Sequence, residues 1–187
     1  MRHYVPVAFA VFLRPLRETS WWLGLALAGT VAAAAMALVM DGIRDWPRDQ
    51  MAVVGSSLGG FYARWFALQT GCRAVLLNPA AHPARDLASH IGEQTTWQNP
   101  EERFFFEPGF VDELRALESD IARLSPASPA TPERLVALIA KGDEVLDWRE
   151  MQAFCAGGGI RLLEGGDHAI SDFEARIGFQ STLVSSH

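Results

Sequence analysis

The sequence has few cysteines, and its histidines stand apart from one another. Cys72 and Cys155 are the only two thiols, and they are far apart in the chain. Two isolated thiols form neither a disulfide framework nor a zinc-ligand pair, so we expect free thiols and a reducing, cytoplasmic compartment. His82 and His90 also lack partners at metal-ligand spacing. The sequence therefore predicts no metal site.

Positive charge is also scarce. The 187 residues include 16 Lys and Arg against 22 Asp and Glu, which gives a net charge of −6. This balance argues against nucleic acid or an anionic membrane surface as a partner. Hydrophobic residues make up 49% of the chain, enough for one domain with an ordinary core. The glycines at 157–159 follow no strand that could make a phosphate loop, and we expect no cofactor.

Charge is missing altogether from Thr19 to Met40. About twenty apolar residues can cross a bilayer as a helix. Arg14 and Arg17 precede this run and Asp41 follows it, an order that suits an anchor running from inside to outside. Membrane anchoring by residues 19–40 is one interpretation of the N-terminal part, although not the favoured one.

Gly55-Ser56-Ser57-Leu58-Gly59 is the most informative stretch of the chain, because it fits the pattern G-x-S-x-G. The apolar residues 51–54 before it predict a strand, and residues 60–68 after it predict a helix. A sharp strand-to-helix turn strains the central serine and exposes its hydroxyl. Glycines two residues before and two after the serine allow the close approach of the backbone. We therefore expect Ser57 to be a nucleophile, against the alternative of a plain glycine-rich turn.

A nucleophilic serine needs a base, and the base needs an orienting acid. With this kind of turn the chain order is Ser, then Asp or Glu, then His. The apolar run 135–140 predicts a buried parallel strand, and Asp143 follows its carboxyl end, where ligands bind in such sheets. Asp143 is our candidate acid, although an aspartate here could also serve a turn. Asp147 is the second candidate, expected to enter the next helix.

His168 is the candidate base. It follows the predicted strand 160–164 and so also lies at a carboxyl strand end, although an ordinary loop histidine would fit the same place. Asp167 is adjacent in sequence and points elsewhere, which makes it a poor orienting partner for His168.

Strand candidates alternate with helical segments, which predicts an α/β fold with a parallel sheet. The strands are expected at 51–54, 73–77, 135–140 and 160–164. Asn78 and Pro79 follow the second of these and should help to wall a substrate pocket. The excursion 81–132 is expected to form a small cap with an amphipathic helix at 112–124. Its Phe104, Phe105 and Phe106 would either line an acyl pocket or pack the cap onto the sheet.

Together, four motifs resemble one known family. They are V-G-S-S-L-G-G-F-Y-A at 54–63, L-N-P-A at 77–80, G-D-E-V-L-D at 142–147 and E-G-G-D-H-A at 164–169. Over residues 32–184 the chain resembles the YqiA-like small bacterial α/β-hydrolase esterases. The resemblance implies that the protein cleaves small-molecule carboxylic esters or acyl thioesters. It also implies that Ser57 is the nucleophile, Asp143 the acid and His168 the base.

The chain departs from that family at its start. Family members open with a strand and a His-Gly-Phe loop that supplies one N–H of the oxyanion hole, and the residue after the nucleophile, here Leu58, supplies the other. No His-Gly pair occurs in this sequence. Loss of one such donor costs about 100- to 1,000-fold in turnover. The alternative function is therefore an impaired or inactive hydrolase-fold protein, serving as a binding module or the product of an altered gene.

The atypical segment 1–31, ahead of a hydrolase domain at 32–187, leaves three interpretations open. An upstream frame shift or a wrongly chosen start could have replaced the true opening. Residues 19–40 could be a membrane anchor. A divergent but folded opening would instead place a strand at Tyr4 to Leu13 and a helix at Ala32 to Ile43, where the alanine-rich sequence strongly favours a helix.

Overall fold

The computed structural model describes residues 12–15, 32–95, 103–125, 130–171 and 173. The strands are β1 (Phe12–Pro15), β2 (Met51–Ser56), β3 (Arg73–Leu77), β4 (Gly92–Thr95), β5 (Arg103–Phe106), β6 (Leu135–Ala140) and β7 (Gly159–Leu163). The helices are α1 (Ala32–Gly42), α2 (Leu58–Thr70), α3 (Pro83–Leu87), α4 (Pro108–Leu124) and α5 (Trp148–Phe154), with 3-10 turns η1 (Arg48–Gln50) and η2 (Ala88–His90).

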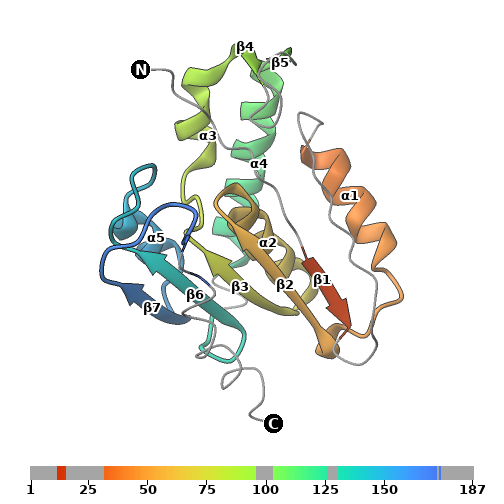
Figure 1. The fold of residues 1–187 in the computed structure, drawn as a ribbon. Coiled ribbons are helices and arrows are strands. Elements are labelled where there is room, and N and C mark those ends of the chain that lie inside the picture. Colours follow the sequence, from red (N-terminus) through yellow and green to blue (C-terminus); the bar gives the residue numbers. More distant parts are fainter. Residues whose placement is uncertain (1–11, 16–31, 96–102, 126–129, 172, 174–187) are drawn as a thin grey trace.

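A five-stranded sheet in the order β1-β2-β3-β6-β7 forms the centre (Figure 1). The strands β2, β3, β6 and β7 run parallel, and β1 pairs antiparallel with β2. The parallel sheet and all of its predicted strands are confirmed, with ends that differ by at most two residues. For example, β2 continues to Ser56, because this residue still pairs with Leu77 of β3.

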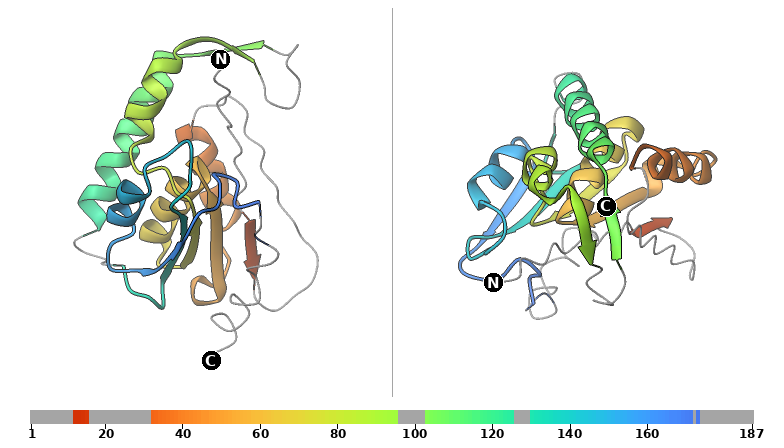
Figure 2. Two further views of the ribbon diagram at one scale, coloured as in Figure 1. Left: turned by 60° about the vertical axis from the view of Figure 1, so that its left-hand side comes forward. Right: turned by 90° about the horizontal axis from the view of Figure 1, so that it is seen from above.

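Alternation along β2 shows which face of the sheet packs against the helices. Met51 and Val53 are buried, whereas Ala52 and Val54 are only half-buried. The buried side chains join those of α1, α2, α4 and α5 in one core, and Figure 2 shows these helices on the same side of the sheet. The carboxyl ends of β2, β3, β6 and β7 all lie at one edge of the sheet, since the strands are parallel. This edge carries the candidate site.

The excursion expected at 81–132 holds α3, the β4–β5 hairpin and α4. Helix α4 begins at Pro108, four residues before the predicted start, because proline suits the first turn of a helix. Its buried face consists of Val111, Leu114, Leu117 and Ile121. Helix α3 packs on α4, where the Glu118 carboxylate accepts the Ala84 N–H at 3.0 Å.

The start of the chain is described only in part. Of the strand expected at Tyr4 to Leu13, the last two residues lie in β1, and the rest falls outside the described residues. The predicted helix before the nucleophile strand is present as α1. The apolar run 19–40 overlaps α1 at its end, and residues 19–31 fall outside the described part. Within the described ranges, no helix is long and apolar enough to span a bilayer.

Both thiols are free, as expected, and both are buried. The burial of Cys155 should make the stability of the fold depend on pH in the alkaline range. Burial raises the pKa of Cys155 from 9.0 to about 12. Between these values the unfolded chain loses the proton and the folded chain keeps it, so stability falls by up to about 1.4 kcal/mol per pH unit. We expect a shallower fall in unfolding free energy from about pH 9 to about pH 11 in Cys155→Ala, measured by urea unfolding. Parallel curves for the two proteins would contradict this.

Candidate functional site

Ser57 occupies the turn between β2 and α2 with φ 55° and ψ −124°, a backbone conformation that non-glycine residues rarely adopt. The turn is held from the β3 side, since the Ser57 N–H donates to the Leu77 carbonyl at 2.9 Å. The Ser57 carbonyl accepts the N–H groups of Gly60 and Ala80, each at 2.9 Å. The expected strained serine between a strand and a helix is therefore present, and its backbone is anchored to the loop after β3.

The three predicted catalytic side chains lie in one hydrogen-bonded row. His168 Nε2 is 2.9 Å from Ser57 Oγ, and His168 Nδ1 is 2.8 Å from Asp143 Oδ2. These residues are 111 and 25 positions apart in the chain, and the fold brings them together at the carboxyl ends of β2, β6 and β7. The Asp143 side chain is 0% exposed and that of His168 is 10% exposed. Water has little access to the bond between them.

The acid is oriented by backbone donors. Asp143 Oδ1 accepts the N–H groups of Val145 and Leu146, each at 2.8 Å, which leaves Oδ2 to face the imidazole. A carboxylate is only an acceptor, so the proton of the neutral imidazole lies on Nδ1 and the lone pair on Nε2 faces the serine hydroxyl. This is the tautomer that can take the serine proton.

The other nearby aspartates serve local structure. Asp147 caps the start of α5, and its carboxylate accepts the Arg149 N–H at 2.9 Å, which agrees with its expected place at the start of a helix. Asp167 accepts the backbone N–H and the hydroxyl of Ser171, and this hydroxyl bond is the main reason that the pKa of Asp167 is lowered. Neither carboxylate is bonded to the imidazole of His168 in these contacts.

Leu58 is the residue that we expect from the sequence to donate to an oxyanion. It is the first residue of α2, and the first N–H groups of a helix have no intrahelical acceptor. The positive end of the helix dipole lies at the same place. On the other side of β2, Pro15 pairs with Met51 and Phe12 with Val54, so β1 ends beside the start of β2. The end of β1 therefore lies away from Ser57.

The predicted pocket residues occupy different settings. Asn78 is 0% exposed, and its amide is bonded to the Asp167 carbonyl and to the N–H of Ala140 at the end of β6. Pro79 is buried against Gly60 of α2. Phe105, on β5, is 57% exposed, and the side chain of Phe104 falls outside what the structure describes. The sequence did not reveal Glu144, whose carboxylate accepts the His168 N–H at 3.0 Å. In the sequence, only the position of Glu144 directly after the candidate acid Asp143 could have pointed to this contact.

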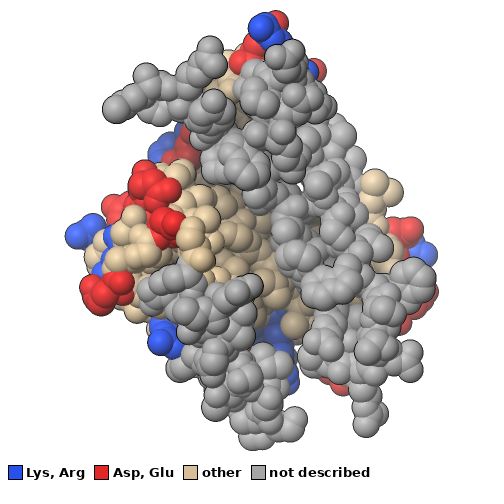
Figure 3. Space-filling model, in the orientation of Figure 1, with Lys and Arg blue, Asp and Glu red and all other residues tan. Residues whose placement is uncertain are grey.

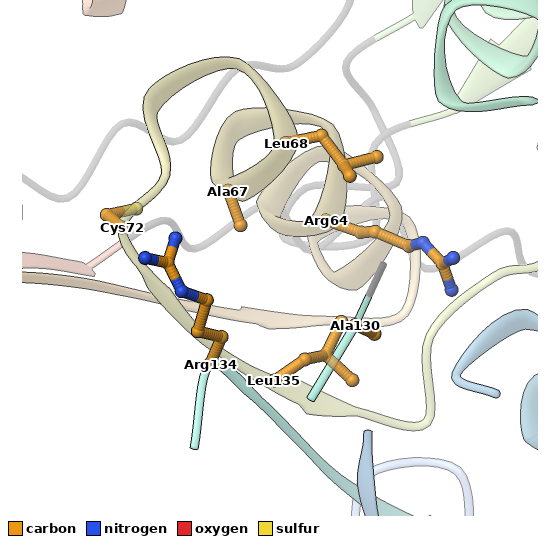
Figure 4. A pocket seen from close by; sticks show the side chains of 7 residues that line it. All are labelled: Arg64, Ala67, Leu68, Cys72, Ala130, Arg134 and Leu135. Carbon is orange, nitrogen blue, oxygen red and sulfur yellow. The ribbon is translucent and has the colours of Figure 1, made fainter. Parts of the chain in front are cut away.

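A small cavity lies at the other end of α2. It measures about 30 Å³ and is lined by Arg64, Ala67, Leu68, Cys72, Ala130, Arg134 and Leu135. Figure 4 shows that the guanidinium groups of Arg64 and Arg134 point away from each other, the latter toward Cys72. The cavity holds none of the three side chains of the hydrogen-bonded row, so it is separate from the candidate site.

Negative charge gathers beside the acid loop, residues 141–147 between β6 and α5. Figure 3 shows acidic side chains grouped on the left of the molecule, the side of α5 and β7. Glu144 and Asp147, which precede α5, and Glu164, which follows β7, are exposed. Such a surface repels polyanions. Among the described residues, no group of His, Cys, Asp and Glu is arranged to hold a metal ion.

Comparisons with known proteins agree with this fold. A family model described as "Uncharacterised protein family (UPF0227)" matches residues 27–181. The chain is also similar to the solved structure of alpha/beta hydrolase domain-containing protein 10 from mouse, with a TM-score of 0.58 and 19% identity over 85% of this chain and 71% of that one. It is similar to an esterase domain from Rhodothermus marinus, with a TM-score of 0.54 and 17% identity over 83% of this chain and 67% of that one. A structure from the metagenome-derived lipolytic enzymes LipS and LipT matches with a TM-score of 0.61 and 16% identity over 84% of this chain and 75% of that one.

At these identities the similarity concerns the fold, and the predicted α/β-hydrolase class is confirmed. The chain spans 67% to 75% of the length of these structures, and 65% of another match, a hydrolase from Agrobacterium vitis.

Proposed function

This chain belongs to the uncharacterised protein family UPF0227, and we propose that it is a serine hydrolase that cleaves carboxylic esters or acyl thioesters of small molecules. The observation that carries the proposal is the hydrogen-bonded row from Ser57 through His168 to Asp143, with the serine on a strained strand-to-helix turn. The structural neighbours described as an esterase domain and as lipolytic enzymes add support for this reaction class.

The mechanism follows from the orientation of the imidazole. His168 Nε2 takes the proton of Ser57 as Oγ attacks the ester carbonyl, and the same proton then goes to the leaving alcohol or thiol. A bond forms between Oγ and the acyl carbon, and the carbon's bond to the leaving group breaks. His168 then deprotonates a water that attacks the acyl carbon. The bond from this carbon to Oγ breaks, the acid leaves, and the proton on His168 returns to Ser57. Asp143 holds the tautomer and stabilises the imidazolium at each step.

The charge that develops on the substrate oxygen needs donors of its own. The Leu58 N–H, at the start of α2, is one such donor in our proposal. The two buried thiols suit a reducing compartment, and we propose that the protein acts in the cytoplasm. The residues of the row supply all the acid–base steps of this reaction.

Fluorophosphonate labelling tests the proposal directly. Serine attack on phosphorus with loss of fluoride requires the same activated hydroxyl as ester cleavage. We expect one adduct per chain by intact mass, located on Ser57 by peptide mapping and absent from Ser57→Ala. The buried thiols, with pKa values raised by burial, are expected to stay unlabelled. A folded wild-type protein that takes up no label would overturn the proposal.

One observation favours a second candidate, a hydrolase-fold protein that binds a ligand without turning it over. The chain lacks a His-Gly pair, and β1 runs antiparallel to β2 with Pro15 beside Met51, at the opposite end of β2 from Ser57. Among the described residues, the end of β1 therefore lies too far from Ser57 to complete an oxyanion hole. Uptake of the label decides between the candidates, because phosphonylation also develops negative charge on oxygen.

We also propose that Phe105 of β5 contacts the acyl chain. Phe105 is 57% exposed, although a large apolar side chain prefers burial. Phe105→Ala is expected to lower kcat/KM on octanoate esters by about 10-fold and on acetate esters by less than about twofold, since burial of a phenylalanine contributes about 1.5–3 kcal/mol. Assays of p-nitrophenyl esters of increasing chain length measure this. Equal losses on all esters would assign Phe105 to cap packing.

A further inference from the structure

We infer that Asn78 and Glu144 are positioning residues that clamp the backbone of His168, an inference that rests on the proposed function. The side chain of Asn78 is 0% exposed, and its Nδ2 donates to the carbonyl groups of Asp167 at 3.1 Å and His168 at 3.0 Å. On the opposite side of the same peptide unit, the His168 N–H donates to Glu144 at 3.0 Å. Both backbone polar groups of the base are therefore held by side chains.

Asn78 also ties the base to the nucleophile. Its neighbours bracket Ser57, since the Leu77 carbonyl accepts the Ser57 N–H and the Ala80 N–H donates to the Ser57 carbonyl. One short loop thus touches the backbone of Ser57 through its main chain and the backbone of His168 through one amide. The contacts of this loop with Ser57 and His168 then set the 2.9 Å distance between His168 Nε2 and Ser57 Oγ.

The same amide reaches the strand that leads to the acid. The Ala140 N–H, at the end of β6, donates to Asn78 Oδ1 at 2.8 Å. Asp143 lies three residues further on. Gly142 lies against the Gly165–Gly166 backbone of the base loop, residues 164–169 after β7. Asn78 therefore holds the ends of β3 and β6 and the base loop in one arrangement, and Glu144 links the acid loop to the base from the other side.

Asparagine is suited to this place in two respects. Its φ is 40°, in the left-handed region that asparagine tolerates better than most residues. The asparagine amide also offers both kinds of hydrogen-bonding group. Its NH₂ donates to the two carbonyl oxygens, and its oxygen accepts the Ala140 N–H. Aspartate has the same shape and backbone tolerance but presents an acceptor to the two carbonyl groups, so Asn78→Asp removes the clamp with little change in volume.

The test measures fluorophosphonate inactivation rates and the kcat and KM of p-nitrophenyl acetate hydrolysis. Asn78→Asp is expected to lower both kcat and the inactivation rate by about 100-fold, with KM changed less than about threefold, because a displacement near 1 Å has that effect on rate. Glu144→Ala should lower both by about 5-fold, and Glu144→Gln, which keeps an acceptor oxygen, should restore most of the loss. Val39→Ala in α1 is the matched control, since it removes buried methyl groups away from the row.

A second readout separates positioning from lost stability. The proton between His168 Nδ1 and Asp143 gives a low-field NMR resonance when the pair is ordered. We expect this resonance in the wild type and in Val39→Ala, and its loss in folded Asn78→Asp.

A folded Asn78→Asp that keeps both the resonance and the wild-type rate would overturn the clamp. If Asn78→Asp does not fold, equal rates for Glu144→Ala and the wild type would overturn it instead. A wild type that takes up no label contradicts the proposed function, and the resonance still tests the clamp.

Discussion

Replacing Asp143 by asparagine is expected to lower kcat on a carboxylic ester by about 10⁴-fold in a protein that stays folded. The reason lies in the two backbone donors on Oδ1, the N–H groups of Val145 and Leu146. They require an oxygen at that position, so the new amide oxygen takes it and the NH₂ group turns to His168. Nδ1 must then accept, the imidazole proton moves to Nε2, and the base can no longer take the serine proton.

Asp147→Asn is the matched control for this prediction. It is the second acidic candidate of the sequence, four residues further on, and it makes the same change of charge. Its carboxylate caps α5, and asparagine caps a helix about as well as aspartate. We expect kcat within about twofold of the wild type and an unchanged unfolding midpoint. Stopped-flow hydrolysis of an activated ester measures both variants, and an equal loss in the two would contradict the assignment of Asp143.

Local sequence was enough to predict the parallel sheet and the strand-to-helix turn at Ser57, which we call the elbow. The strands are apolar runs bounded by polar or glycine residues, and each motif follows the carboxyl end of a strand, where a parallel sheet collects its loops. The sequence favoured Asp143 as the acid and kept Asp147 as the second candidate, since both follow β6 closely. That choice depends on α5 beginning at Trp148, which uses the side chain of Asp147 as a cap.

Long-range contacts were the part that sequence could not provide. Asn78 was expected to wall a pocket because it follows a strand at the ligand edge. Its actual partners, Ala140 and the 167–168 peptide, lie 62 to 90 positions away, and no local pattern encodes that pairing. The antiparallel direction of β1 is a similar case, because a short apolar strand has the same pattern in either direction. The β4–β5 hairpin was missed, since Gly92–Thr95 has no apolar alternation.

Gly55→Ala is expected to unfold the elbow or the whole domain, with a loss of about 3 kcal/mol or more in unfolding free energy. A Cβ at this position would lie 2.0 Å from the Gly59 carbonyl oxygen and 2.8 Å from the Gly60 nitrogen. These are backbone atoms of the first turn of α2, so no flexible side chain can move aside. Gly60 is in turn held against Pro79, where a Cβ on Gly60 would come within 2.8 Å. Helix α2 therefore cannot retreat from β2 without breaking its contact with the loop after β3.

Gly109→Ala provides the control, since nothing lies within 4 Å of a Cβ placed there, near the start of α4. Alanine favours a helix over glycine by up to about 1 kcal/mol, so this variant should be as stable as the wild type or slightly more stable. Thermal unfolding should show a midpoint for Gly55→Ala at least about 6 °C below that of the wild type. Fluorophosphonate labelling should fall with it, because the turn that exposes Ser57 needs this close approach. A stable, fully labelled Gly55→Ala would mean that the serine reacts without the strained turn, and that the reactivity must instead come from His168 and Asp143 alone.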